Sequence, residues 1–193
     1  ARRGMEVVGL DIDPAKVRLP AAWPDTPTMR RSLARYYDCI AVMDQQFGEF
    51  LQQLEKDGLA EDTIVVFFAD NGPGFPGGKS ASLNLGVHEP FMIRFPKRFQ
   101  SLAPAAPGAV VDRLVSFVDF APTMLGLAGI AKPSHMNGRA FLGPNTEKPA
   151  QYAVGVRDRI DETLDVSRWV RDARYHYVRN YRTHLPADQN SLD

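Results

Sequence analysis

Three polar residues near the middle of the chain have the types and the spacing to perform chemistry. Asp70 and Asn71 are adjacent, and Lys79 follows them across a segment rich in glycine and proline. Carboxylate and carboxamide oxygens are hard ligands that suit Ca²⁺ or Mg²⁺. A lysine on a flexible loop can bind a tetrahedral anion as a mobile point charge. A metal ion and a lysine together could therefore hold a sulfate or phosphate ester and stabilise charge on its oxygens.

The same residues also have a simpler structural interpretation. Asn71 and Gly72 form an Asn-Gly pair, which is one of the strongest turn signals in a sequence. A lone lysine in a loop is ordinarily solvated. Residue types and spacing alone leave both interpretations open, so the elements that position these residues matter.

Two apolar segments flank the polar residues. Residues 63–69 are mostly β-branched or aromatic and apolar on both faces, which predicts a buried central strand that ends at Asp70. Residues 90–95 predict a second strand. In sheets covered on both faces, ligands bind just beyond the carboxyl ends of the strands. The sequence therefore predicts that Asp70, Asn71 and Lys79 lie where ligands commonly bind.

A long amphipathic helix is predicted before the first strand. Thr26 and Pro27 form a good helix start, because a hydroxyl can cap the helix and proline fits its first position. Apolar residues then recur at spacings of three and four up to Asp57, and Gly58 is the expected stop. The order helix, turn, strand, loop, strand predicts an α/β fold with a mainly parallel sheet and flanking helices.

The last part of the chain has a different pattern. A helix is expected from Asp119 to Gly129, and residues 131–150 have the proline- and glycine-rich composition of a linker. We therefore expect residues 1–130 to belong to one domain and residues 151–193 to form a small antiparallel subdomain. The strand-like segments of this subdomain are residues 152–156, 166–171 and 175–181.

The composition argues against two kinds of partner. The chain has 193 residues, 44% of them hydrophobic, with 23 basic and 23 acidic side chains. This balance disfavours nucleic acid, although arginine and tyrosine are interleaved between residues 168 and 182. No apolar segment approaches the roughly 20 residues that cross a bilayer, so no membrane partner is expected. The chain begins at Ala1 without a visible signal sequence, and we expect it to be a piece of a longer protein.

Four segments of the chain resemble the C-terminal part of the formylglycine-dependent sulfatases, members of the alkaline phosphatase superfamily. Two are similar to the family's long helix with its metal-binding strand and to its lysine-bearing loop: RYYDCIAVMDQQFGEFLQQLEKDGLAEDTIVVFFADNG and GKSASLNLGVHEPFMIRFP. The others are similar to a later helix and to the C-terminal hairpin: SFVDFAPTMLGLAGI and RWVRDARYHYVRNY. The resemblance implies an alkaline-phosphatase-like fold, of which this chain would form the C-terminal portion.

The resemblance also implies roles for individual residues. Asp70 and Asn71 match the family's second pair of calcium ligands, and Lys79 matches the catalytic lysine that contacts the sulfate group. His88 is implied as a substrate contact at the rim of the site. Glu89 matches the acidic residue before the strand proline, and no catalytic role is carried over to it. The implied cofactor is one Ca²⁺ ion, half of whose ligands would lie outside this chain.

The implied substrate is a sulfated carbohydrate or an aryl sulfate. The short loop GPGFPGGK is most similar to the sulfamidase-like subgroup, which acts on N-sulfated glucosamine of the heparan type. That subgroup usually has arginine where this chain has Lys79, which leaves sugar O-sulfates open beside N-sulfates. Arg157 and Arg159 belong to a charged segment, residues 157–162, expected as a loop between two C-terminal strands. This loop is either solvated or a rim that recognises the sugar.

The chain departs from the family at the nucleophile. The family makes its formylglycine from Cys or Ser in a Cys/Ser-x-Pro/Ala-x-Arg motif, whereas Cys39 is followed by Ile-Ala-Val-Met. The early aspartate pair that completes the calcium site is also missing. We therefore expect turnover to require the missing N-terminal part of the same protein, and none from residues 1–193 alone.

Two alternatives accompany the sulfatase interpretation. One is a phosphoester hydrolase of the same superfamily, which would use a Thr or Ser nucleophile and a two-metal site. The other is a non-catalytic module with a decayed site. The family resemblance also implies an extracytoplasmic location, which is periplasmic, secreted or lysosomal.

Overall fold

The computed structural model describes residues 11–160 and 163–185. The chain divides into two compact units, residues 1–62 and residues 63–193. The linker composition at residues 131–150 therefore falls inside the second unit, and a domain boundary there stays a prediction.

The first unit is built on one long helix, α1 (Pro27–Lys56). The Thr26 hydroxyl caps it by accepting a hydrogen bond of 3.1 Å from the backbone N–H of Met29. Just beyond the helix, Gly58 adopts a φ of 71°, a left-handed conformation that ends helices readily. Both predicted ends of this helix are confirmed. A short 3₁₀ helix, η1 (Pro14–Lys16), lies against α1.

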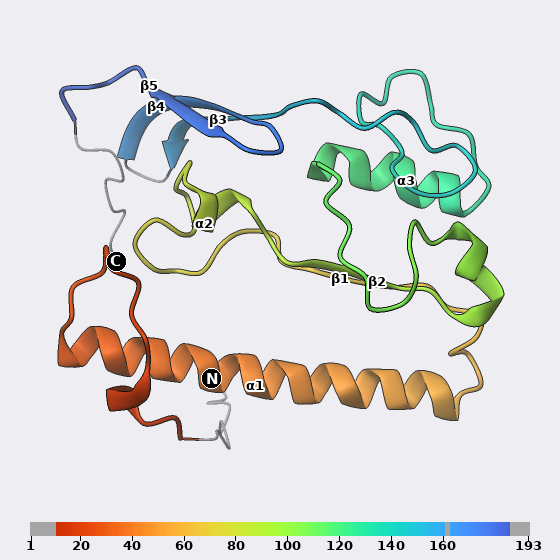
Figure 1. Cartoon of the computed structure of the whole chain (residues 1–193), viewed down its shortest axis with the longest axis horizontal. Coiled ribbons are helices and arrows are strands. Elements are labelled where there is room, and N and C mark those ends of the chain that lie inside the picture. The colour runs from red at the N-terminus through yellow and green to blue at the C-terminus, as the bar shows by residue number, and fades with distance from the viewer. Residues whose placement is uncertain (1–10, 161–162, 186–193) are drawn as a thin grey trace, which may run out of the picture. The chain divides into compact units, whose positions relative to one another are not determined.

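The second unit begins with two paired strands, β1 (Val65–Phe68) and β2 (Phe91–Arg94). Both strands were predicted, but they pair antiparallel, with Phe68 opposite Phe91. The intervening chain holds only a loop and one helical turn, α2 (Asn84–Val87), so it returns alongside the strand it left (Figure 1). Every strand pair in the described part of the chain is antiparallel, so the expected mainly parallel sheet is not shown by these residues and stays a prediction.

A cluster of aromatic rings links β1 and β2 to the chain that follows them. The ring of Phe68 lies 5.1 Å from that of Phe120, and the ring of Phe91 lies 5.8 Å from that of Phe141, measured between centroids. Phe120 begins α3 (Phe120–Leu127), the helix predicted after Asp119. The cluster therefore links the strand pair to α3 through ring contacts, with Phe68 itself 42% exposed.

Asp119 has a different role from the simple helix cap that was expected. Its carboxylate accepts hydrogen bonds from the backbone N–H groups of Ser116 and Arg139, at 3.1 and 2.8 Å. It thereby joins the start of the helix to a segment further along the chain. Two short 3₁₀ helices complete this region, η2 (Lys97–Leu102) and η3 (Phe117–Asp119).

The C-terminal residues form an antiparallel sheet of three strands in the order β3 (Ala153–Ile160), β4 (Thr163–Arg171) and β5 (His176–Asn180). This confirms the predicted antiparallel pairing, while a separate C-terminal subdomain stays a prediction. The expected charged loop was wrong, because Arg157 and Arg159 lie within β3, on either side of a bulge. Charged residues continue the strand here because some face solvent and others pair across it. Residues 161 and 162 of that segment lie outside the described residues.

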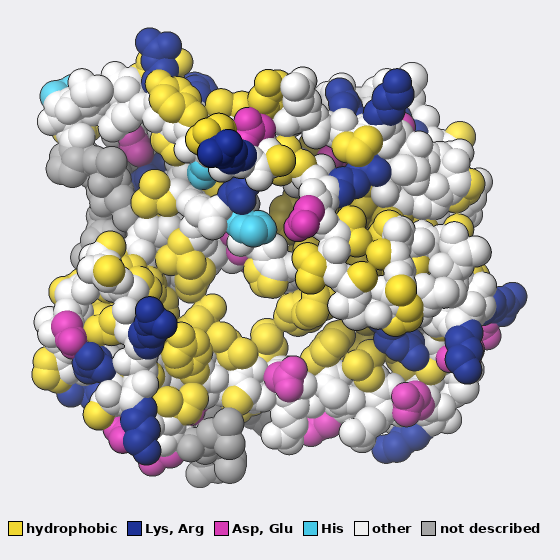
Figure 2. Space-filling view, viewed as in Figure 1, with side chains coloured by type: hydrophobic (Ala, Val, Ile, Leu, Met, Phe, Trp, Pro, Cys, Tyr) yellow, Lys and Arg dark blue, Asp and Glu magenta, His cyan; other side chains and the backbone are white. Residues whose placement is uncertain are grey.

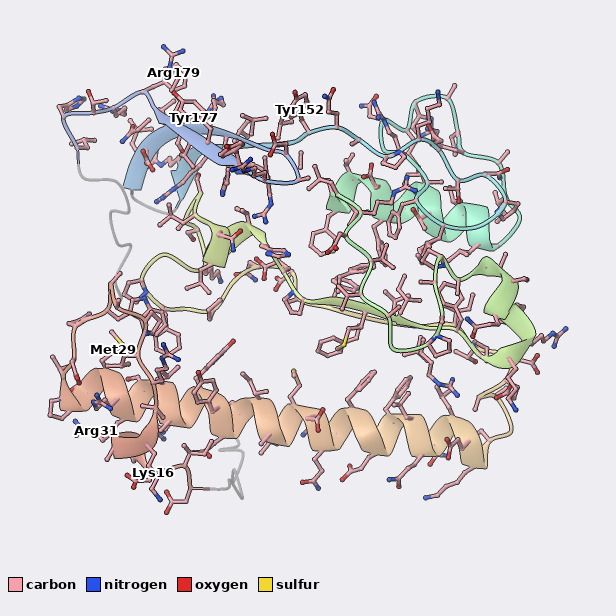
Figure 3. The ribbon with its side chains drawn as sticks, in the orientation of Figure 1. Lys16, Met29, Arg31, Tyr152, Tyr177 and Arg179 are labelled. Atoms are coloured by element: carbon pink, nitrogen blue, oxygen red, sulfur yellow. The ribbon has the colours of Figure 1, made fainter. Side chains whose placement is uncertain are left out.

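The two faces of this sheet differ. In Figure 3, Tyr177 and Arg179 lie on the face turned away from α2, and their side chains are exposed. The opposite face carries Ser167 and Trp169, which alternate with the exposed positions along the strands.

On the face shown in Figure 2, cationic and anionic side chains are interspersed among hydrophobic ones. No helix in the described ranges is both long and apolar enough to cross a lipid bilayer.

Candidate functional site

The end of β1 brings two carboxylates together. The backbone N–H of Ala69 donates to the carbonyl oxygen of Pro90 at 3.3 Å, which extends the pairing of the two strands by one residue. Asp70 and Glu89 therefore stand next to each other where the strands end. Burial, and then the negative charge of Asp70, raise the pKa of the Glu89 carboxyl above its ordinary value of 4.5.

Two oxygens at this corner lack hydrogen-bond partners. The amide nitrogen of Asn71 donates to the Asp70 carboxylate, and this leaves Asn71 Oδ1 buried without a donor. Glu89 Oε1 is likewise buried without a donor. Buried acceptors in folded proteins normally have a donor or a cation beside them. The corner of Asp70, Asn71 and Glu89 therefore fits a cation that prefers hard oxygen ligands, such as Ca²⁺ or Mg²⁺.

The corner alone does not make a complete metal site. Within residues 11–160 and 163–185, no group of three or more His, Cys, Asp or Glu side chains lies together. Calcium takes six to eight oxygen ligands. A cation bound at this corner would therefore take further ligands from outside the described residues.

The loop after Asn71 folds back on itself, because two glycines allow close backbone approach. A Cβ atom on Gly72 would lie 2.1 Å from the carbonyl oxygen of Leu85, and one on Gly78 would lie 2.1 Å from that of Pro73. The backbone N–H of Lys79 also donates to the carbonyl oxygen of Pro73, at 2.8 Å. The loop thus returns the backbone of Lys79 to its own start, close to the corner.

Lys79 lies between two residues with left-handed backbone conformations, one of which is not a glycine. Gly77 has a φ of 77° and Ser80 has a φ of 75°. The left-handed region is uncommon for residues other than glycine, and such conformations concentrate at functional sites. The Lys79 side chain is exposed, so its ammonium group is accessible to an anion.

The other candidate residues occupy different surroundings. His88 is exposed and directly precedes Glu89 in the sequence. Arg157 is buried in the C-terminal sheet, where its guanidinium lies 3.2 Å from the Asp165 carboxylate. Arg159 is exposed on the same strand. His88 is thus adjacent in sequence to the corner, and Arg157 belongs to an internal ion pair. Substrate contacts by His88, Arg157 and Arg159 stay predictions.

Sequence reasoning missed Glu89 as a member of the corner. A signal was available, because strands that end at Asp70 and begin after Pro90 bring residues 70 and 89 side by side when they pair antiparallel. The expected parallel arrangement concealed this neighbour.

Two protein families match this chain. The family described as Sulfatase matches residues 12–130, which is most of the chain. The C-terminal family of N-sulphoglucosamine sulphohydrolase matches residues 79–184. The chain belongs to the sulfatase family. The resemblance seen in the lysine loop and in the C-terminal hairpin is thereby confirmed.

Curated sulfatases align along nearly all of this sulfatase chain. An ulvan-active sulfatase from Formosa agariphila is 40% identical over 177 residues, covering 90% of the chain and 29% of that protein. N-sulphoglucosamine sulphohydrolase from Homo sapiens is 31% identical over 192 residues, covering 92% and 37%. The chain therefore spans about a third of the length of these curated relatives.

Solved structures share the fold. One, determined in complex with its substrate D-glucosamine-2-N,6-O-disulfate, has a TM-score of 0.57 at 26% identity and covers 80% of this chain and 32% of its own. Another, a Bacteroides fragilis protein assigned as a sulfatase, has a TM-score of 0.67 at 22% identity. It covers 89% of this chain and 39% of its own, and shows the fold alone.

Proposed function

We propose that this chain is the C-terminal part of a calcium-dependent hydrolase that cleaves sulfuric esters or sulfamates on sulfated sugars. The observation that supports the calcium role best is the pair of buried, donorless oxygens of Asn71 and Glu89 beside the Asp70 carboxylate. Family membership supports the reaction class. The names of two relatives support the substrate class, because they specify ulvan and N-sulphoglucosamine.

In this proposal different residues of the chain bind the metal ion, the sulfate group and the sugar. Asp70 and Asn71 would hold Ca²⁺, whose positive charge stabilises negative oxygens of the sulfate group. Lys79 would bind the same group from the loop as a mobile cation. His88 and Arg159, both exposed, would contact the sugar at the rim, whereas Arg157 is committed to Asp165.

The rest of the site would come from the remainder of the protein. The formylglycine nucleophile and the other calcium ligands would lie outside this chain, as would the strands of an alkaline-phosphatase-like, mainly parallel sheet. The chain has Lys79 where sulfamidase-like relatives usually have arginine, so both N-sulfates and O-sulfates belong in the substrate trials. We propose an extracytoplasmic location on family resemblance.

The test uses the complete coding sequence that contains this chain. The encoded protein should hydrolyse an aryl sulfate and a sulfated disaccharide in the presence of calcium, while residues 1–193 alone should show no turnover. Loss of an outer partner of a metal ligand typically costs 10–100-fold, so Asp70→Ala should lower kcat/KM by at least about 100-fold. Asp112→Ala, at an exposed carboxylate outside the corner, is the control and should have little effect.

Several outcomes would overturn the proposal. An unchanged rate for Asp70→Ala would exclude its ligand role. Preference for phosphate esters would favour the phosphoester hydrolase. A complete gene without the Cys/Ser-x-Pro/Ala-x-Arg motif and the aspartate pair would favour a non-catalytic module.

A further inference from the structure

A buried pair of serines joins the lysine loop, residues 72–83, to the C-terminal sheet. The hydroxyl oxygens of Ser82 and Ser167 are 2.9 Å apart, although 85 positions separate the two residues in the sequence. Ser82 is 8% exposed and Ser167 is 3% exposed. A hydrogen bond shielded from water is costly to break, because each hydroxyl would be left unpaired. Ser82 follows Lys79 by three residues, so the bond holds the loop close to its cation.

A second polar contact lies next to this pair. Arg171 at the end of β4 donates a hydrogen bond to the side-chain oxygen of Asn84 at the start of α2. Ser167 and Arg171 are four residues apart on one strand and therefore face the same side of the sheet. In Figure 1, α2 lies beside the sheet at this point. One face of β4 thus contacts Ser82 in the lysine loop and Asn84 at the start of α2.

The position of Ser167 is itself fixed by a buried ion pair. Arg157 lies directly opposite Ser167 across β3 and β4. Its guanidinium pairs with Asp165 at 3.2 Å, and the two side chains are 6% and 7% exposed. Breaking such a pair would leave an uncompensated buried charge, so the pair favours this alignment of the two strands. Ser167 therefore lies beside a buried contact between β3 and β4, next to the bulge between Arg157 and Arg159.

The lysine loop needs support from outside itself. Residues on both sides of Lys79, namely Gly77 and Ser80, have positive φ values of 77° and 75°. A left-handed residue other than glycine persists only where the surrounding structure holds it. The loop has no helix or strand before α2, and the side chains that it buries are those of Ala81 and Ser82. The contact between Ser82 and β4 provides such support.

We propose that Ser82 and Ser167 are positioning residues, through which the C-terminal sheet holds the Lys79 loop in the conformation that binds the sulfate group. The coupling of loop and sheet follows from the contacts described above. Its consequence for sulfate binding rests on the proposed function of Lys79. The C-terminal sheet is then a part of the sulfate-binding apparatus although its serine touches no substrate.

The first test measures the loop directly and needs no activity. In the complete protein, Ser167→Ala should raise amide hydrogen exchange across residues 78–87 by about tenfold, because it leaves the Ser82 hydroxyl buried and unpaired. The double variant Ser82→Ala with Ser167→Ala removes both hydroxyls, and exchange should return toward the wild-type rate. Thr123→Val is the matched control, since Thr123 is fully buried and bonds to Asp119 and Phe141 away from the loop.

The second test measures catalysis in the same variants. Ser167→Ala should raise KM for a sulfated substrate by about tenfold and change kcat less, because a misplaced Lys79 loses binding that ground and transition states share. The double variant should recover part of the loss, a pattern that general destabilisation does not produce. Thr123→Val should leave KM unchanged.

The outcomes separate this inference from the proposed function. Unchanged exchange in residues 78–87 of Ser167→Ala would overturn the coupling of loop and sheet, as would an equal rise in Thr123→Val. Faster exchange with an unchanged KM would overturn the positioning role. A wild-type protein without any turnover would overturn the proposed function alone, because the exchange result would still stand.

Discussion

Asp70 and Asn71 lie just beyond the end of β1, where their side-chain oxygens are available to a ligand. The amide of Asn71 is used by the Asp70 carboxylate, so its carbonyl oxygen is left for another partner. The second carboxylate, Glu89, adds negative charge that Asp70 repels. Two neighbouring carboxylates are stable together when a proton or a cation lies between them. At the scale of single residues, the corner therefore favours either a protonated Glu89 or the cation proposed above.

Removing the charge of Glu89 should have opposite effects on the stability of the calcium-free protein and on its affinity for calcium. Glu89→Gln should raise the free energy of unfolding of the calcium-free protein, because one of two like charges is removed. The same substitution should weaken calcium binding several-fold, because a negative charge beside the ion is lost. Denaturation in a chelator and calcium titration calorimetry measure the two effects. Glu61→Gln, at an exposed glutamate, is the control, and tighter calcium binding by Glu89→Gln would contradict the assignment.

His176 gives a prediction about pH. Burial, and then the positive charge of Arg171 opposite it, lower the pKa of His176 below its ordinary value of 6.5. As the pH falls below 6.5, the unfolded chain takes up a proton that the folded chain resists, so folding stability declines. His176→Phe keeps a ring against Trp169, whose centroid lies 5.4 Å away, but cannot titrate.

The measurement is the urea midpoint between pH 7 and pH 5. The wild type should lose more stability over this range than His176→Phe, and the difference should vanish above pH 7. His135→Gln, at an exposed histidine, should behave like the wild type. Identical pH profiles for the wild type and His176→Phe would rule out this role of His176.

At the scale of elements, the C-terminal sheet depends on one close contact between strands. Gly155 of β3 lies opposite Trp169 of β4, and a Cβ atom on Gly155 would lie 2.1 Å from the tryptophan ring. The ring occupies the space of the missing side chain, as aromatic residues do over glycine in antiparallel pairs. This contact lies on the same face of β4 as Ser167, so packing and polar contacts share that face.

Two glycine-to-alanine substitutions should therefore act in opposite directions. Gly155→Ala should destabilise the protein by about 1–3 kcal/mol, because a methyl group is forced against a rigid ring. Gly48→Ala, inside α1 with no atom within 4 Å of the added methyl, should stabilise it by about 0.5–1 kcal/mol. Thermal melting of both variants measures the signs. A neutral Gly155→Ala would mean that Trp169 can move aside at little cost.

At the scale of the whole molecule, the chain spans only part of the length of its sulfatase relatives. The corner of Asp70, Asn71 and Glu89 supplies too few oxygen ligands for a complete Ca²⁺ site within the described residues. An incomplete ligand set fits a chain that covers about a third of the length of these relatives.

Calcium should stabilise the complete protein more than the isolated chain. A ligand present at 100 times its Kd adds about 2.7 kcal/mol to the stability of the folded state, which raises Tm measurably. The complete protein should show this rise and lose it in a chelator or with Asp70→Ala. Residues 1–193 should respond weakly, because they supply only part of the ligand set. An equal shift in the isolated chain would show that it holds the ion without other segments.

The sequence by itself determined the features that depend on local chemistry. The ends of α1 followed from a threonine cap, a proline and a glycine, and the strands β1 and β2 followed from short apolar segments. The resemblance of four segments, from the long helix to the C-terminal hairpin, identified the sulfatase family, whereas the Asp70-Asn71 pair and Lys79 alone left a turn and a binding site both open. The signals for the helix and the strands lie within a few residues of their effects.

Only the tertiary structure decided which distant residues meet. The antiparallel pairing placed Glu89 beside Asp70, the register of β3 and β4 buried Arg157 against Asp165, and packing brought Ser82 to Ser167. No local periodicity encodes these contacts, because they depend on strand direction, on a bulge and on how the lysine loop lies against the sheet. The physical reason is that pairing between remote segments is selected by the burial and hydrogen bonding of the folded chain as a whole.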